Sequence, residues 1–306
     1  MLRAIFIGLS GSHALRAFAE RTRIGQSLSQ RFVAGTTVAD VLTATRAINE
    51  KGMTCSIDNL GENVTNEAEA RRSAALYDSL LEQIAARGLK ANVSLKLTHM
   101  GLDVDESLAR ELVSALAAHA ARSGNFVRVD MEGSSYTQRT LDIVRQLHRN
   151  AENAGAVGAV IQSYLKRSQT DVEALIGEGI RIRLCKGAYQ EPPEIAFQKK
   201  SDVDANYIRL MQMLLKSDIY HGIATHDPKM IEATLRFAGA EKITSDRFEF
   251  QMLYGIRRDL QTELVRNGWR MRVYIPFGTA WYPYLMRRLA ERPANLFFVL
   301  KNLFRR

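Results

Sequence analysis

Eight short apolar or β-branched runs alternate with longer amphipathic segments from about residue 53 onward, and this alternation constrains the fold most. The runs are MTCSIDN, NVSLKL, FVRVDM, AVIQSY, RIRLCKG, HGIATH, FEFQML and RMRVYIPF. Intervening segments such as 66–88 and 105–124 have helical periodicity, with an acid near the start and Gly at the end. Eight βα units in one uninterrupted series predict an α/β fold, a closed parallel (β/α)8 TIM barrel.

An open doubly wound sheet is the main alternative, and it would more often carry a Gly-rich phosphate loop after its first strand. The sequence has no such loop and no Pro-, Gly- or Ser-rich linker within the series. Residues 1–50 contain helical patterns and no strand of comparable quality. We therefore expect residues 1–50 to form a helical arm packed on the barrel, and residues 51–306 to form the barrel itself.

Composition fits a large folded protein, because 46% of the 306 residues are hydrophobic and 25% are charged. Cys55 and Cys185 both lie in apolar strand-like runs, which favours reduced thiols in an intracellular protein over a disulfide. No apolar run approaches the roughly 20 residues that cross a bilayer. We therefore expect a cytoplasmic protein.

The net charge of +9 is local, because residues 251–306 hold 11 Lys and Arg against 3 Asp and Glu. The tail ANLFFVLKNLFRR combines cations with apolar residues, which suggests a peripheral contact with anionic lipid on the inner face of the cell membrane. The simpler interpretation is that most of these apolar side chains pack on the domain. No nucleic acid is expected as a partner, because no motif that reads bases is present.

Polar residues gather at the ends of the predicted strands, where a barrel of this kind performs its chemistry. They include Asp58 and Glu62, Lys96, Asp130 and Glu132, Gln162, Arg183 and Lys186, Thr225 and His226, Glu249 and Gln251, and Tyr274. Barrel strands are normally almost wholly apolar, so each of these groups needs a partner or a ligand. Interior salt bridges, such as Lys96 with Asp130, are the alternative to a binding site.

One segment near the C-terminus has a polar helical face. Tyr284, Arg287, Arg288 and Glu291 are spaced at i, i+3, i+4 and i+7, so a helix places them on one side. A pair of arginines suits a small carboxylate ligand, because guanidinium groups bind both carboxylate oxygens. A solvated helix face that happens to carry adjacent arginines remains the alternative.

Several motifs together resemble the proline dehydrogenases, a family of flavin enzymes. These are RLCKGAY, ATHD and VYIPFGTAWYPYLMRRLAERP, with SLKLTHMG, VRVDMEGS, QSYLKRS and EFQMLYGIR. The resemblance covers roughly residues 53–300 and implies a distorted (β/α)8 barrel with extra N-terminal helices, whose last helix lies over the C-terminal mouth. Cys185 departs from the pattern, since the family often has valine there.

The resemblance also implies roles for individual residues. On the substrate side it implies Arg287, Arg288 and Lys96 on the proline carboxylate, Asp130 beside that lysine, Tyr274 and Leu184 against the ring, Tyr284 for preference over hydroxyproline, and Glu62 as a gate. On the cofactor side it implies Arg183 near the flavin N5 atom, Met131 and Gln162 on the isoalloxazine, Lys186, Gly187 and Ala188 along the cofactor, and Thr225, His226 and Glu291 on other parts of FAD.

The implied function is oxidation of L-proline to Δ1-pyrroline-5-carboxylate, the first step of proline catabolism, by hydride transfer to FAD, with a quinone as final electron acceptor. One alternative is a hydroxyproline dehydrogenase, and another is a non-catalytic barrel that binds a carboxylate or lipid. A metal-dependent hydrolase has less support, because the six histidines include no paired ligand spacing at strand ends. The oligomeric state stays open.

Overall fold

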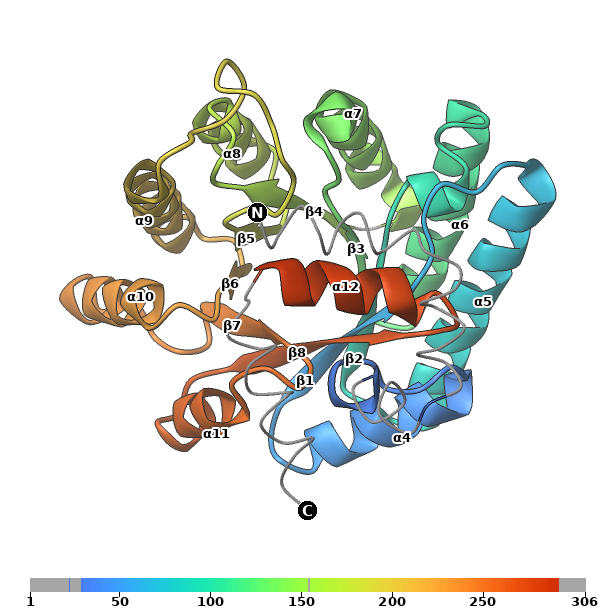
Figure 1. Cartoon of the computed structure of the whole chain (residues 1–306), viewed down its shortest axis with the longest axis horizontal. Coiled ribbons are helices and arrows are strands. Elements are labelled where there is room, and N and C mark those ends of the chain that lie inside the picture. Colours follow the sequence, from blue (N-terminus) through green and yellow to red (C-terminus); the bar gives the residue numbers. More distant parts are fainter. Residues whose placement is uncertain (1–21, 23–28, 154, 292–306) are drawn as a thin grey trace.

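A closed barrel of eight parallel strands forms the centre of the molecule (Figure 1). The computed structural model describes residue 22, residues 29–153 and residues 155–291, with side chains as far as Met286. The strands follow one another around the barrel in chain order: β1 (Thr54–Asn59), β2 (Ala91–Leu95), β3 (Val127–Val129), β4 (Val157–Gln162), β5 (Ile182–Cys185), β6 (His221–Ala224), β7 (Phe248–Leu253) and β8 (Met271–Phe277). Each strand overlaps one of the eight predicted runs, so the predicted barrel is confirmed.

Helices surround the barrel in the order that the sequence pattern predicts (Figure 1). They are α4 (Val38–Asn49), α5 (Glu67–Ala86), α6 (Glu106–Arg122), α7 (Ser134–Arg149), α8 (Ser168–Gly177), α9 (Lys200–Lys216), α10 (Pro228–Ala240), α11 (Arg258–Arg266) and α12 (Trp281–Glu291), with short 3-10 turns at Thr98–Met100 and Ala151–Asn153. Polar caps fix several starts: the side chains of Thr37, Asn66, Asp105 and Asp227 accept hydrogen bonds from the first turns of α4, α5, α6 and α10.

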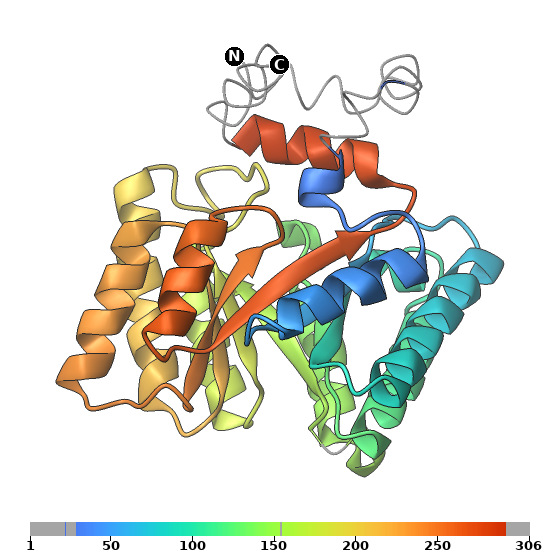
Figure 2. The same ribbon diagram turned by 90° about the horizontal axis from the view of Figure 1, so that it is seen from below.

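The last helix lies over the barrel instead of beside it. Figure 2 shows α12 above the ends of the strands, and Figure 1 shows it crossing the mouth. Its apolar residues Trp281, Tyr282, Tyr284, Leu285 and Met286 pack in one cluster with Phe32, Val33 and Leu60. Contacts from the chain before α4 and from the loop after β1 therefore hold α12 over the mouth, as predicted.

The N-terminal part of the chain supplies one helix of the ring that surrounds the barrel. Helix α4 packs against β1 and β8 and so fills the position that a helix after β8 normally occupies. The capping box of Thr37 and Asp40 fixes where α4 begins, because each residue accepts a backbone N–H of the other.

Within the described residues, no helix combines the length and apolar character of a membrane span.

Strand alternation divides the side chains into an apolar layer beneath the helices and a polar layer inside the barrel. On β5, Arg183 reaches hydroxyls of β1 and β2 across the interior, so the next residue, Leu184, faces the opposite way. Leu184 is fully buried in the main apolar core and pairs with Ile161 and Ile223. The expectation that Leu184 lines the substrate pocket is therefore wrong. Leu184 instead packs in the apolar core between the strands and the surrounding helices.

Candidate active site

Arg183 is the centre of the polar interior. Its Nε donates to Gln251 Oε1 at 2.5 Å, and its Nη2 donates to Ser56 Oγ at 3.0 Å. Nη1 donates to Asp130 Oδ1 at 2.7 Å and to Ser94 Oγ at 3.1 Å. Four side chains, from β1, β2, β7 and the residue after β3, accept hydrogen bonds from this guanidinium, so its orientation is fixed from several directions.

Asp130 joins Arg183 to Tyr274. The Tyr274 hydroxyl donates to Asp130 Oδ2 at 2.7 Å, while the Arg183 guanidinium lies 5.1 Å from the centroid of the Tyr274 ring. Burial and then the negative charge of Asp130 raise the pKa of Tyr274 well above its ordinary value. Tyr274 therefore remains a neutral phenol that donates to the carboxylate.

Lys96 lies just beyond the end of β2 and forms an ion pair with Asp58, with Nζ and Oδ2 3.3 Å apart. Burial alone would lower the pKa of Lys96. The negative charges of Asp58, Asp130 and Glu62 raise it by more than burial lowers it, so the pKa of Lys96 lies above its ordinary value. The ammonium therefore stays charged. The alternative of an interior salt bridge between Lys96 and Asp130 is wrong in its partner, because Lys96 pairs with Asp58 and Asp130 pairs with Arg183.

A second polar group lies where β5 and β6 end. Lys186 Nζ donates to Asp204 Oδ1 at 2.5 Å and to Asp227 Oδ2 at 2.7 Å. Gly187 has a φ of +107°, and a Cβ built there would lie 2.2 Å from Tyr164 Cδ1, so a side chain at this position is strongly disfavoured. Residues 187 to 190 are exposed. The loop that begins at Gly187 therefore exposes its backbone next to the Lys186 ammonium.

The remaining expected cofactor residues line the same end of the barrel. Gln162 is buried at the end of β4 and donates to the Glu132 carbonyl at 2.9 Å, and Met131 lies buried in the core. Thr225 Oγ1 accepts from the Asp227 N–H, and Ala188 is exposed. His226 Nε2 accepts from the Leu253 N–H at 2.9 Å, which places the proton of a neutral ring on Nδ1.

Helix α12 carries four of the expected residues, and only one side chain among them is described. Tyr284 is 7% exposed within the apolar cluster beneath α12. Arg287, Arg288 and Glu291 belong to this helix, but their side chains lie outside the described residues. Glu62 is half-buried in the loop after β1, and its charge acts on Lys96. Its expected pairing with Arg287 stays a prediction.

The sequence did not assign roles to several residues that complete the interior. Asp58 pairs with Lys96, Ser56 and Ser94 hold Arg183, and Gln251 connects Arg183 to Glu249. Leu253 is half-buried at the end of β7, in register with Tyr274. For the polar members of this set, the signal is a polar residue at every second strand position, because such positions share the inward face.

No metal centre is apparent in the part of the chain that the structure describes, where no three His, Cys, Asp or Glu side chains gather suitably. Cys55 and Cys185 are both free thiols. The arrangement instead combines fixed cations, a buried carboxylate and a phenol at the mouth of a barrel. Fixed cations of this kind can hold and orient an anionic organic ligand.

Comparison with known proteins identifies relatives along nearly the whole chain. A family profile described as proline dehydrogenase matches residues 41–301. Proline dehydrogenase 1 of Bacillus subtilis subsp. natto is 40% identical over 308 residues, covering 100% of both chains. Proline dehydrogenase of Deinococcus radiodurans is 39% identical, covering 95% of this chain and 97% of the relative.

A solved structure agrees with these sequence matches. Proline utilization A from Bdellovibrio bacteriovorus, inactivated by N-propargylglycine, superposes with a TM-score of 0.83 and 27% identity. The match covers 89% of this chain and 33% of that larger protein. The barrel described above therefore corresponds to about one third of that structure.

Proposed function

This chain belongs to the proline dehydrogenase family, and we propose that it oxidises L-proline to Δ1-pyrroline-5-carboxylate with FAD as its bound hydride acceptor. The observation that supports this most is the linked set of Arg183, Asp130 and Tyr274 in the interior of the barrel. The reaction is the first step of proline catabolism.

The residues at the barrel mouth fit a flavin dinucleotide. The exposed loop at Gly187 offers backbone without side-chain bulk, and Lys186 beside it suits a phosphate. We assign FAD to Met131, Gln162, Arg183, Lys186, Gly187, Ala188, Thr225, His226 and Glu291. Lys186 is held by two carboxylates in this structure, so its contact with FAD requires it to share or exchange these partners.

When bound, FAD supplies the acceptor for the hydride that leaves C5 of proline. Arg183 presents a positive charge that its four partners hold in place, and a fixed charge stabilises developing negative charge without reorganisation. Asp130 acts on the reaction through Arg183 and Tyr274, whose positions it fixes.

The substrate carboxylate is assigned to Lys96, Arg287 and Arg288, and the substrate ring to the face of Tyr274. These cations lower the pKa of the bound substrate amine, which favours the neutral amine that oxidation requires. Tyr284 is assigned to the preference for proline over hydroxyproline, and Glu62 to a gate that pairs with Arg287. Orienting a small rigid substrate against the acceptor supplies much of the rate increase.

We further propose that a quinone receives the electrons, and that the protein is cytoplasmic with peripheral contact to the inner face of the membrane. The net charge of +8 in residues 251–306 supports this contact, since cations attract anionic headgroups. Cosedimentation with anionic vesicles at low salt tests it. Failure to cosediment, or to reduce a soluble quinone, contradicts this part of the proposal.

The absorbance spectrum of the purified protein tests the main proposal. We expect a yellow protein that releases FAD on denaturation and turns over L-proline faster than hydroxyproline. The reverse preference would favour the hydroxyproline dehydrogenase alternative. A colourless protein that neither binds added FAD nor oxidises either compound would favour the non-catalytic barrel.

A further inference from the structure

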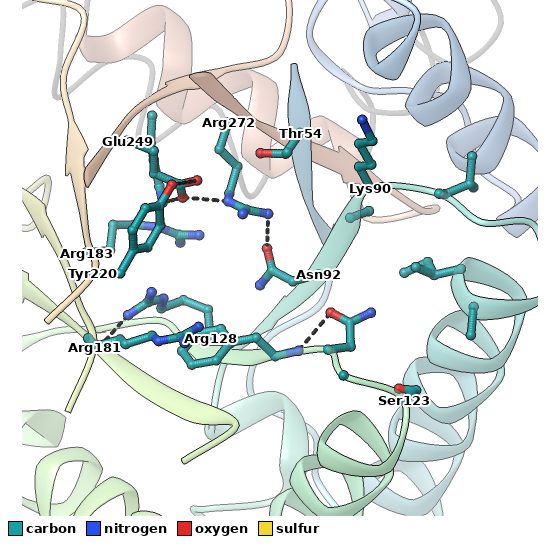
Figure 3. Close-up of a pocket in the computed structure, with 18 of the residues that line it drawn as sticks. Thr54, Lys90, Asn92, Ser123, Arg128, Arg181, Arg183, Tyr220, Glu249 and Arg272 are labelled. Carbon is teal, nitrogen blue, oxygen red and sulfur yellow. Dashed lines mark hydrogen bonds and ion pairs between the residues drawn. The ribbon is translucent and has the colours of Figure 1, made fainter. Parts of the chain in front are cut away.

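A cavity of about 360 Å³ lies at the opposite end of the barrel from the candidate active site (Figure 3). Its walls include Thr54 and Ala91, the first residues of β1 and β2, and Arg272 near the start of β8. The segments before β2 and β3, at residues 88–90 and 123–126, complete the rim. This opening is formed by strand beginnings, whereas the site proposed above is formed by strand ends.

The lining of this cavity is strongly cationic. It contains Lys90, Arg128, Arg181, Arg183 and Arg272 against one carboxylate, Glu249. Arg183 pairs with Asp130, and Arg272 pairs with Glu249 at 2.5 Å. Within the described residues, no carboxylate lies in ion-pair range of the other three cations.

Glu249 is already saturated by its own neighbours. Its Oε1 accepts from Arg272 Nε and from Gln251 Nε2 at 2.6 Å, and its Oε2 accepts from the Tyr220 hydroxyl at 3.0 Å. Burial tends to raise the pKa of Glu249, but the charge and hydrogen bond of Arg272 lower it overall. Glu249 therefore neutralises Arg272. The positive charges of Arg128 and Arg181, on the other side of the cavity, have no carboxylate partner in the lining.

Arg128 is a buried cation that the fold holds in place. Only 6% of it is exposed, and its Nη1 donates to the carbonyls of Ala159 at 2.9 Å and Arg181 at 2.7 Å. A Cβ on Gly158 would lie 2.9 Å from this Nη1 and 2.4 Å from the Arg181 carbonyl oxygen. The lack of a side chain at Gly158 therefore makes room for the guanidinium.

Phe126 holds two guanidinium groups near one ring. The Arg128 and Arg181 guanidinium carbons lie 4.7 Å and 5.2 Å from its centroid. Figure 3 shows these two arginines together on one side of the cavity, apart from the Glu249 and Arg272 pair. Two neighbouring guanidinium groups repel each other, and a buried one without a counterion is costly, so an anion between them would stabilise both.

We propose that this cavity is a binding site for a small oxyanion of the phosphate or dicarboxylate class. Arg128 and Arg181 bind its oxygens from one wall, and Lys90 contributes positive charge at the rim. The site is separate from the proposed substrate and flavin positions, although Arg183 contributes to the inner wall of the cavity. It extends the function proposed above and does not depend on it.

Titration calorimetry of the purified holoprotein in low-salt buffer tests the proposal, with inorganic phosphate in one arm and succinate in the other. Sodium chloride at matched ionic strength corrects for general screening. Binding of either probe above the chloride control supports the oxyanion class, and the arm that binds identifies which member. Binding of neither overturns the proposal.

The variant Arg181→Gln locates the site, because Arg181 is exposed at the rim and its loss leaves the backbone carbonyl that Arg128 uses. We expect the Kd of this variant for the probe that binds to rise about tenfold or more, because a hydrogen bond between charged groups is lost. The matched control is Arg236→Gln on α10, whose partner is the exposed Glu232. Unchanged binding in Arg181→Gln, or an equal loss in the control, overturns the assignment.

Discussion

Arg183 on β5 and Asp130, which follows β3, form a 2.7 Å ion pair across the interior of the barrel. Tyr274 on β8 donates to the other oxygen of the same carboxylate. One carboxylate thus fixes a guanidinium and a phenol that come from distant parts of the sequence. This arrangement makes Asp130 a positioning residue whose removal affects two neighbours at once.

Replacing Asp130 with Asn keeps the shape of the side chain and removes the charge that faces Arg183. We expect flavin reduction by proline to slow about tenfold to a hundredfold, because one charged hydrogen bond contributes roughly 1.5 to 3 kcal/mol. Rapid mixing under anaerobic conditions measures this rate. The control Asp246→Asn changes an exposed carboxylate before β7 and leaves the rate unaltered. Equal rates in both variants would refute the role of Asp130.

Replacing Lys96 with Met removes the cation assigned to the substrate carboxylate. We expect KM for proline to rise about tenfold to a hundredfold while the rate at saturation falls less, because the lost contact acts mainly on binding. Steady-state kinetics over a wide proline range separates the two. Lys51→Met, on the exposed turn after α4, is the matched control. A variant that melts lower yet keeps its KM would show that Lys96 only pairs with Asp58.

Gly222 on β6 leaves room for the side chain of Gln251, which hydrogen-bonds both Arg183 and Glu249. A Cβ there would lie 2.3 Å from Gln251 Nε2, so Gly222→Ala must displace Gln251 from Arg183 and Glu249. We expect a loss of about 1 to 3 kcal/mol in the free energy of unfolding, measured by urea titration.

The control for that change is Gly239→Ala, near the end of α10, where nothing lies within 4 Å of an added Cβ. This substitution should leave stability unchanged or raise it by up to about 1 kcal/mol, because alanine favours helix. If Gly222→Ala were as stable as Gly239→Ala, the interior would have space that the structure does not show.

His221 makes stability depend on acidity. Burial, and then the charge of Arg128, lower the pKa of His221 to about 3, and its Nδ1 accepts from the Ile182 N–H. In the unfolded chain the pKa is about 6.5, so between these values only the unfolded state binds the proton. The free energy of unfolding therefore falls as the pH falls from about 6.5 toward 3, by at most about 1.4 kcal/mol per pH unit from this group.

The variant His221→Asn removes this titration, and we expect a shallower loss of stability between pH 6 and 4.5, on the order of 1 kcal/mol per pH unit less steep. Urea unfolding at several pH values gives the slope. His119→Asn, on α6 outside the barrel, is the control. Identical slopes in the two variants would show that His221 is not the group responsible.

The barrel could be predicted because each strand and helix has its own local pattern. Period-two and helical periodicities identify elements one at a time, and their regular order leaves few folds. The position of α12 over the mouth came instead from the resemblance to a family. Periodicity alone gives its polar face and says nothing about what that face contacts.

The errors concern directions and partners that no local pattern specifies. The family resemblance implies a place for Leu184 in the substrate wall, but Leu184 follows Arg183 directly, and neighbours on a strand face opposite ways. Lys96 pairs with Asp58 on β1, whereas Asp130 pairs with Arg183 on the far side of the barrel. Pairings across a closed barrel depend on its diameter and side-chain reach, which sequence spacing does not contain.

The cavity at the strand beginnings was also not predicted. Arg128 is the single charge in the apolar part of its run, and Arg181 is the first residue of a run that also contains Arg183, so neither spacing indicates a shared site. Their shared contact with Phe126 appears only when β3 and the start of β5 come together. Gly158 was equally inconspicuous until the space beside it proved to hold a guanidinium.

The central claim is that fixed cations inside this barrel hold proline against a bound flavin. Anaerobic addition of L-proline to the purified protein, followed by absorbance, tests it most directly, with proline deuterated at C5 as a second substrate. We predict that one equivalent of proline bleaches the flavin bands and that the deuterated compound does so more slowly. A flavin spectrum that excess proline leaves unchanged would contradict the account.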